Sequence, residues 1–477
     1  MTELNQNLVV EDSQEQVELQ PTSELIYGLN DRPPVPEAMF VALQHVLAAF
    51  VGIITPPLII CGGLGLDPTN TSYIVSMSLF SSGICTFIQC RKIGPVGSGL
   101  LSLQGTSFAF LGPILGVGTF ALQGGRSPEQ ALALIFGVCF FGSAVEIILS
   151  RFLHLMSKII TPVVSGTVVM IIGLGLIKTG IVSLAGGAIA QKNGTFASTQ
   201  NLLLGGAVLL IVVLLTTSKN RFLRMGAIAI GLIVGYIAAA MLGMVNFSVL
   251  SKLAIISLPI PFRYGLSFDF GAFLPFILLY VLTAIETVGD LTATSAVSGE
   301  PVSGAVYVRR IKGGVLGDGV NSAIAALLNT FPNTTFSQNN GVIQMTGVGS
   351  RYVGFFVAGI FVILGLSPIV GGIFQAIPQP VLGGATTVMF GSIAVAGLNI
   401  VTSVKLDRRS TIIVAVSLAM GLGVIYAPEI FANKPPIIKN LFGSSISTGG
   451  LTAILLSWLL PGGDTAAEET QVVEAEV

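Results

Sequence analysis

The chain has 477 residues, of which 52% are hydrophobic and only 9% are charged. A soluble domain carries about 25% charged residues, so this composition excludes an ordinary water-facing surface and predicts one polytopic membrane protein. The net charge of −1 leaves no basic excess to neutralise phosphates, which excludes nucleic acid as a partner. Four cysteines without CxxC spacing and two histidines give no recognisable metal site.

Long apolar runs recur between two polar, acidic tails, residues 1–36 and 463–477. A membrane-spanning helix needs about 20 mainly apolar residues. Two stretches, 97–118 and 332–347, are apolar but rich in Gly, Ser, Thr, Asn or Gln, and we expect them to be interrupted spans. Twelve stretches are long enough for full spans: 38–62, 71–90, 128–149, 160–181, 200–218, 225–246, 270–295, 313–331, 353–375, 380–401, 410–427 and 446–461.

The placement of basic residues favours a total of fourteen segments. With the N-terminus in the cytoplasm, fifteen Lys and Arg residues fall on the cytoplasmic side and seven on the opposite side. Cytoplasmic loops of membrane proteins carry such an excess of basic residues. Leaving out either interrupted stretch would invert every later loop and weaken the bias. The sequence therefore predicts an all-α membrane protein with both tails in the cytoplasm.

Two pairs of segments indicate an internal repeat. PVVSGTVVMIIG (162–173) and PVLGGATTVMFG (380–391) share a Pro-Val start and two Gly positions. The interrupted stretches are separated by a similar offset, with Gln104 in the first and Gln338 in the second. A repeat of seven spans would enter the membrane in the opposite orientation, as in transporters with paired broken helices. The alternative is chance similarity between membrane helices, in which Gly and Pro are common.

Ionisable residues inside the predicted spans are few and clustered. Glu286 and Asp290 lie at i and i+4 on one helix face. Asp318 lies in the next span and His45 in the first. A carboxylate within a membrane usually faces a cavity, has a partner or holds a proton, so these carboxyls are candidates for proton-coupled transport. Asp290, Asp318 and His45 are equally explained as structural hydrogen-bond anchors. Glu146, near the end of its span, is expected at the membrane interface.

A second polar cluster, SQNNG (337–341), lies in the second interrupted stretch. Its Gln and Asn side chains each donate and accept hydrogen bonds in one plane, as the edge of a heterocyclic base does. Glu286 would accept from two N–H groups, and Phe108 at the first interruption would supply a ring face or a backbone N–H. This combination favours a flat base with alternating N–H and C=O groups over an inorganic anion or a lipid.

The run from Gln338 to Gly347 (QNNGVIQMTG) resembles the signature motif of the nucleobase–ascorbate transporters, the nucleobase:cation symporter-2 family. The resemblance covers nearly the whole membrane region and is strong to bacterial xanthine permeases. Other segments that carry it are SELIYGLNDRPPVPEAMFVALQHVLA (23–48), ITPPLIICGGLGL (54–66), GPVGSGLLSLQGTSFAF (94–110) and IETVGDLTATSAVSGEPVSG (285–304). It implies a proton-coupled purine uptake symporter of the bacterial inner membrane, not an enzyme, with xanthine as the first substrate.

The resemblance also implies two inverted seven-span repeats, with segments three and ten broken by short β-strands. Spans one to four and eight to eleven would form a core domain, residues 37–156 and 267–377. The other spans would form a gate domain, residues 157–266 and 378–462. We expect a homodimer that meets through the gate domain, and an elevator-like movement of the core. The expected partners are a small purine, H+, membrane lipid and a second copy, with no cofactor besides the coupling proton.

Site residues follow from the same resemblance. Glu286 is expected to hold the N–H edge of the base, and Gln338 to contact its other edge. Phe108 would meet the ligand at the first broken span, and Ser107 and Ser337 would flank the pocket. Four further positions match residues that serve proton coupling or site geometry in relatives: His45, Asp290, Asp318 and Asn339.

Substrate choice and the class of function have alternatives. The small Ser107 leaves room for urate, whereas Gln338 stands where uracil carriers tend to have an acidic residue, which makes uracil or another nucleobase a weaker choice. A membrane enzyme using Glu286 and Asp290 would have both carboxyls on one helix instead of bracketing a substrate. A passive channel or anion carrier would place acidic groups in the path of an anion.

Overall fold

The computed structural model describes residues 25–153, 161–245 except 221, 222 and 225, 256–431, and 434–460 except 436, 437 and 439–441. The predicted acidic tails lie outside the described residues, apart from 25–36. The described chain is mostly helical, and its strands are a single antiparallel pair, β1 (Gln104–Thr106) and β2 (Asn333–Thr335).

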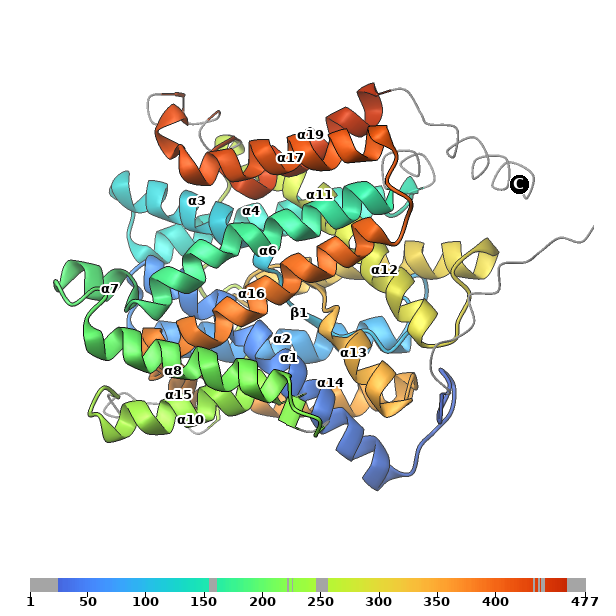
Figure 1. Cartoon of the computed structure of the whole chain (residues 1–477), viewed down its shortest axis with the longest axis horizontal. Helices are drawn as coiled ribbons and strands as arrows, with labels where there is room; N and C mark the ends of the chain where they lie inside the picture. The colour runs from blue at the N-terminus through green and yellow to red at the C-terminus, as the bar shows by residue number, and fades with distance from the viewer. Residues whose placement is uncertain are drawn as a thin grey trace, which may run out of the picture.

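Each of the twelve predicted full spans contains a helix (Figure 1). The first half of the chain forms α1 (Val35–Gly63), α2 (Pro68–Arg91), η1 (Phe108–Phe110), α3 (Leu111–Gln123), α4 (Pro128–Leu149), α6 (Pro162–Leu184), α7 (Gly187–Lys192), α8 (Thr199–Thr216) and α10 (Ala227–Met241). The second half forms α11 (Phe270–Val297), α12 (Gly304–Leu327), α13 (Gln338–Thr346), α14 (Arg351–Gly365), α15 (Pro368–Gln375), α16 (Gln379–Thr402), α17 (Arg408–Tyr426), η3 (Pro428–Phe431) and α19 (Ser445–Leu459).

Eight of the described helices are long and apolar enough to cross a membrane on their own: α1, α2, α4, α6, α8, α11, α16 and α17. Helices α14 and α15 reach this length only together, and they meet at an angle of 78°. The continuous helix expected over 353–375 is therefore wrong. The break lies at Ser367, because a residue that precedes proline disfavours helical backbone. Helix α12 begins at Gly304, well before the expected start at 313.

Local sequence explains where several helices begin. Helices α2, α4 and α6 each have proline in the first turn, where a missing N–H costs nothing. The preceding residues Asp67, Ser127 and Thr161 accept hydrogen bonds from backbone N–H groups of that turn. Ser127 and Gln130 complete a capping box at the start of α4. The sharp starts of these helices are thus dictated by short local signals.

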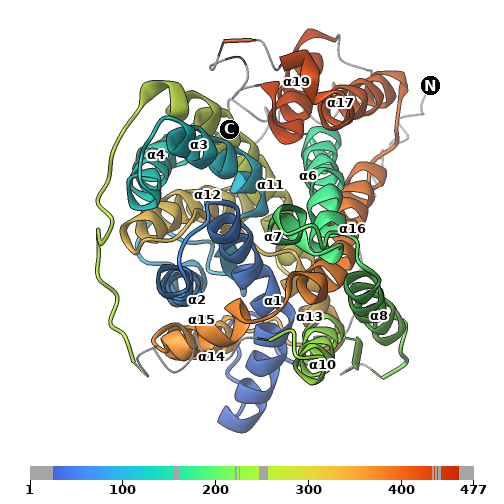
Figure 2. The same cartoon turned by 90° about the vertical axis from the view of Figure 1, so that its left-hand side faces the viewer.

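The helices pack in two groups, which Figure 2 shows on either side of the molecule. One group contains α1 to α4 and α11 to α15, with α2 in contact with α1, α12, α14 and α15. The other group contains α6, α8, α10, α16, α17 and α19. Contacts of α11 with α6 and α19, and of α1 with α10, form the border between the groups.

Helix α2 carries small polar residues into the centre of the first group. Ser72, Ser78 and Thr86 are buried, and their side chains form hydrogen bonds with other segments. Ser72 Oγ donates to the carbonyl oxygen of Pro368 at 2.7 Å, and the backbone N–H of Gln104 donates to Thr86 Oγ1 at 3.0 Å. Small residues let membrane helices approach closely, and their hydroxyls bond across the contact. Helix α2 therefore holds β1 in place.

Helices α6 and α16, which begin with the repeated Pro-Val pattern, pack closely and in opposite directions. A Cβ added at Gly397 would lie 2.3 Å from the backbone N of Met170. A Cβ added at Gly383 would lie 1.9 Å from the backbone N of Leu184. Residue numbers rise along α6 as they fall along α16, so the two helices are antiparallel. Glycine is required at these positions because the backbones touch.

We expect Gly383→Ala to destabilise the protein by about 1–3 kcal/mol, because the new methyl group would force the backbones of α6 and α16 apart. Gly391→Ala in the same helix is the matched control, since nothing lies within 4 Å of its Cβ position. Thermal unfolding of both purified variants in one detergent measures the difference. Equal unfolding temperatures for the two variants would show that the close contact is not needed for stability.

Candidate functional site

The strand pair joins the two stretches that the sequence marks as interrupted, and Figure 1 shows β1 in the interior among the helices. Gln104 pairs with Thr335, and Thr106 pairs with Asn333, in antiparallel register. All residues of both strands are buried. Non-helical backbone inside a membrane protein is tolerated only where its polar groups are satisfied or line a cavity. The two strands satisfy part of this need for each other.

A cavity of about 330 Å³ lies beside the strands, between the two helix groups. Its size is at the lower end of the range for small-molecule sites. Its polar lining residues are Glu286, Asp290, Thr334, Thr335, Ser337, Gln338, Asn340, Gln344 and Asn399. Its apolar lining residues are Phe108, Val169, Ile172, Ala293, Phe336, Ile393, Ala396 and Ile400.

Glu286 is placed in the cavity by α11. It shares one helix face with Asp290 and Ala293, at i, i+4 and i+7, and all three line the cavity. The Oε2 atom of Glu286 is buried and accepts no hydrogen bond from any described residue. Leaving a buried acceptor without a partner costs about 1–3 kcal/mol. This oxygen is therefore available to an N–H donor in the cavity.

Four of the five predicted substrate contacts line this cavity: Glu286, Gln338, Ser337 and Phe108. The ring of Phe108 packs edge-to-face on Phe390 of α16, with 5.4 Å between the ring centroids. Ser107 is the exception, because it is buried outside the lining and its backbone N–H donates to the carbonyl oxygen of Pro332 at 2.8 Å. Their role in binding a substrate stays a prediction.

Asp290 lines the cavity and also fixes α11 to the second interrupted stretch. Its Oδ2 accepts a hydrogen bond from Thr335 Oγ1 at 2.9 Å. One turn further along α11, Thr294 Oγ1 donates to Asn340 Oδ1 at 2.7 Å. These two bonds set the distance between α11 and the segment that carries Gln338. Asp290 can therefore hold the geometry of the site and also face a ligand.

Asp318 is fully buried and lies outside the cavity lining. Its Oδ1 accepts hydrogen bonds from Gln89 Nε2 at 3.1 Å and from Gln104 Nε2 at 2.8 Å. Its Oδ2 accepts from the hydroxyls of Thr287 and Thr334. One carboxyl group on α12 thus connects α2, β1, α11 and β2. This arrangement holds four elements together around one side chain, and the predicted role of Asp318 in proton coupling or site geometry stays a prediction.

His45 and Asn339 lie together outside the cavity lining. His45 is fully buried in α1, and its imidazole lies beside the side chain of Asn339. The Nδ2 of Asn339 donates to the carbonyl oxygen of Leu101. Among the described residues, neither His45 ring nitrogen nor Asn339 Oδ1 has a hydrogen-bond partner. The bond from Asn339 to Leu101 fixes the start of α13, where Gln338 lies.

Sequence reasoning did not assign three polar lining residues to the site: Thr334, Gln344 and Asn399. Gln344 lies at i+4 from Asn340 on α13, so helical periodicity from the amide cluster was a usable signal. Asn399 comes from α16, in a segment where no motif marks it. It is the polar contribution of the second helix group to the lining. The amide pattern of the site is thus wider than the predicted cluster.

Glu146, which the sequence predicts at the membrane interface, is buried among helices, and its depth in the membrane stays a prediction. Its side chain is only 1% exposed, and neither carboxyl oxygen has a hydrogen-bond partner among the described residues. Helices α11 and α12 both pack on α4, and Tyr280 of α11 covers the neighbouring Gly142. Glu146 does not line the cavity. Position near a helix end therefore did not mean exposure.

The functional groups of the cavity are carboxyl, amide and hydroxyl groups and one aromatic ring. No group of three His, Cys, Asp or Glu residues in the described part of the chain is arranged to hold a metal ion. All four cysteines are buried and unpaired. The cavity therefore offers hydrogen-bond recognition and stacking.

Solved structures of membrane transporters share this fold. The transmembrane domain of BicA, a cyanobacterium bicarbonate transporter, matches 91% of this chain and 100% of its own, with a TM-score of 0.57 and 14% identity. The murine anion transporter Slc26a9 in the inward-facing state matches 90% of this chain and 69% of its own, with a TM-score of 0.56 and 12% identity. The chain therefore has the fold of these transporters.

Sequence comparison identifies the family to which the chain belongs. The model of the permease family matches residues 36–430. Xanthine permease XanP of Escherichia coli K12 is 50% identical over 442 residues, 92% of this chain and 95% of XanP. Xanthine permease XanQ of the same strain is 48% identical over 441 residues, 92% of this chain and 95% of XanQ. The chain belongs to the permease family, which confirms the resemblance seen in the sequence; it is a multi-pass membrane transport protein and not an enzyme.

Proposed function

We propose that this chain is a proton-coupled purine uptake symporter with xanthine as its first substrate. The observation that carries the proposal is the cavity lined by Glu286, Gln338 and Phe108. A carboxylate and an amide complement the alternating N–H and C=O groups of a purine dione, and an aromatic ring offers a packing surface. The substrate in the names of XanP and XanQ supports xanthine as the first choice. Urate, which fits the same set of groups, is the alternative.

The proposed topology has fourteen segments in two inverted repeats, with both termini in the cytoplasm of a bacterial cell. The antiparallel packing of α6 and α16, which share a starting sequence, supports the inversion. The antiparallel pairing of β1 with β2 supports it independently. The two helix groups of Figure 2 support a core domain of residues 37–156 and 267–377 and a gate domain of the intervening and following spans. A homodimer through the gate domain is proposed from the family likeness.

Alternating access is supported by a second cavity, of about 790 Å³, which is also lined by both helix groups. Phe108 and Ile172 line the first cavity, whereas Leu111 and Leu176, one turn further along, line the second. These four residues and Phe390 belong to one buried apolar cluster. An apolar barrier about one helical turn thick therefore separates the cavities. Movement of one helix group against the other would open it, as the proposed elevator mechanism requires.

The coupling proton is assigned to the carboxyls near the cavity. Glu286 and Asp290 line it together, and its lining includes no Lys or Arg. Two carboxylates at close range repel each other when both are ionised, and a membrane interior strengthens that repulsion. One of the two carboxyls therefore binds and releases the proton that moves with the substrate. No other cofactor is proposed.

The experiment that tests the function is uptake of labelled xanthine into purine-transport-deficient cells. We expect accumulation above the external concentration, and a fall to the level of cells without the protein when a protonophore collapses the proton gradient. Counterflow of xanthine, which needs no gradient, should persist under the protonophore. Accumulation that resists the protonophore would remove the proton coupling. Competition by unlabelled xanthine, urate, hypoxanthine, guanine and uracil tests the substrate class. If no purine reduces the uptake of labelled xanthine, the assignment of purines as substrates is wrong.

A further inference from the structure

A strongly basic cavity lies apart from the substrate cavity, at the C-terminal ends of α2 and α4 and the first turns of α12. Its volume is about 950 Å³. No Asp or Glu is among its lining residues. Its charged lining residues are Lys92, Arg151, Arg309 and Lys312.

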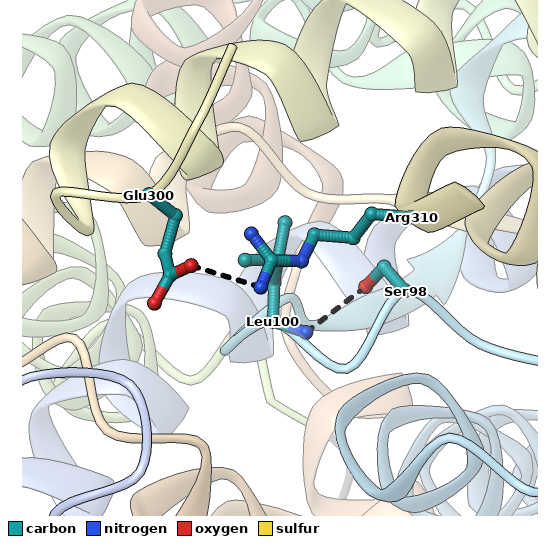
Figure 3. Close-up of polar contacts among 4 residues, drawn as sticks. All are labelled: Ser98, Leu100, Glu300 and Arg310. Carbon is teal, nitrogen blue, oxygen red and sulfur yellow. Dashed lines mark hydrogen bonds and ion pairs between the residues drawn. The ribbon is translucent and has the colours of Figure 1, made fainter. Parts of the chain in front are cut away.

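These four cations have no acidic partner among the described residues. The ion pair found there joins Arg310 to Glu300 at 2.9 Å (Figure 3). Arg310 directly follows Arg309 in α12, but its guanidinium turns to Glu300 and it does not line the cavity. Lys92 and Lys312 are half-buried, so water screens their charges only in part. An anion in the cavity would relieve the repulsion among the cations.

The start of α12 adds to the attraction for an anion. Gly304 and Ala305, at the N-terminus of this helix, line the cavity. The side chain of the preceding Ser303 makes no capping hydrogen bond. The first-turn N–H groups and the helix dipole favour negative charge at such an end. The basic side chains and the helix start therefore act in the same direction.

Exposed apolar side chains flank the basic cavity. Val308 is part of its lining, and Ile93 and Phe152 are the chain neighbours of two of its cations. About half of the surface of each of these three side chains is exposed. A basic pocket between the ends of membrane helices, with apolar groups at its rim, matches a lipid with an anionic headgroup. A free anion would use the cations but not the rim.

We propose that this cavity binds the phosphate of an anionic phospholipid headgroup on the predicted cytoplasmic face of the membrane. The phosphate contacts the four cations and the start of α12, and the acyl chains cover the apolar rim. All lining residues belong to the helix group that carries Glu286 and Gln338. A lipid bound here therefore anchors that group and not the group of α6 and α16. The site is independent of the purine and of the coupling proton.

The test is thermal unfolding of the full-length purified protein in detergent, titrated with short-chain phosphatidylglycerol. We expect phosphatidylglycerol to raise the unfolding temperature and zwitterionic phosphatidylcholine to leave it unchanged. Arg309→Gln/Lys312→Gln should weaken the apparent affinity for phosphatidylglycerol about thirtyfold, because each cation near a membrane surface contributes about 1 kcal/mol. Arg126→Gln/Lys219→Gln removes two exposed cations outside the lining and should keep the parent affinity.

The possible outcomes separate the sources of the phosphate. If inorganic phosphate stabilises the protein as phosphatidylglycerol does, with the same loss in Arg309→Gln/Lys312→Gln, the site is a phosphate site and the lipid is overturned as its occupant. Equal effects of both lipids, or equal losses in both double variants, would overturn the site itself. If the first double variant does not fold, Lys92→Gln/Arg151→Gln removes two charges from the other wall. Parent-like affinity for phosphatidylglycerol in that variant would also overturn the site.

Discussion

Glu286→Gln is expected to weaken xanthine binding at least tenfold without unfolding the protein. Glu286 lines the cavity, and its buried Oε2 has no partner among the described residues. A hydrogen bond to a charged group contributes about 1.5–3 kcal/mol, and about 1.4 kcal/mol corresponds to tenfold in affinity. Glutamine replaces one acceptor oxygen with an NH2 group. This NH2 group is itself a donor, so it would face an N–H donor of the base and the hydrogen bond would be lost.

Glu146→Gln is the matched control for this prediction. It makes the same chemical change at a carboxyl that is 1% exposed but does not line the cavity. We expect its xanthine affinity to stay close to that of the parent. Equilibrium binding to the purified proteins measures the affinity, and thermal unfolding shows that both variants are folded. Parent-like affinity in Glu286→Gln, or an equal loss in Glu146→Gln, would remove Glu286 from the proposed site.

The contents of the cavity were predictable in part because two signals in the sequence are independent. The i, i+4 pair of Glu286 and Asp290 fixes one helix face, and the amide cluster at Gln338 marks an interrupted span. Two interruptions in one membrane chain need each other's backbone groups, so their proximity follows from physical chemistry. The register, which pairs Gln104 with Thr335, could not be predicted in this way. Three-residue strands that are buried on both faces carry no alternating pattern of polar and apolar residues.

The positions that sequence reasoning missed depend on how apolar helices are rotated. Membrane helices such as α6 and α16 are apolar on most faces, so periodicity does not show which face meets the cavity. Asn399 therefore gave no signal until α16 was placed against α11 and α13. Glu146 lies three residues from the end of α4, yet it is buried, and α11 and α12 both pack on α4. Whether a residue near a helix end is buried therefore depends on how the neighbouring helices pack around it.

Asp318 is a position to which the sequence alone could not assign one role. Its place between Gly317 and Gly319 suggested either a helix cap or a coupling carboxyl. The structure instead gives it four side-chain donors, from Gln89, Gln104, Thr287 and Thr334. Its neighbours Gly317 and Gly319 have a separate reason, since a Cβ there would meet the side chain of Gln89 at 2.6 Å or that of Ile147 at 2.8 Å. The glycines allow α12 to approach close enough for the carboxyl to reach its donors.

Asp318→Ala is expected to cost about 2–6 kcal/mol of stability, because Gln89 and Gln104 would each keep a buried amide donor without an acceptor. Asp318→Asn should cost about 1 kcal/mol. Its Oδ1 can still accept from both glutamines, and its NH2 group can donate to the hydroxyl oxygens of Thr287 and Thr334. Thermal unfolding and the yield of folded protein in the membrane measure both variants against the parent. Equal destabilisation by alanine and asparagine would mean that charge, and not the number of acceptors, is what the four donors require at this position.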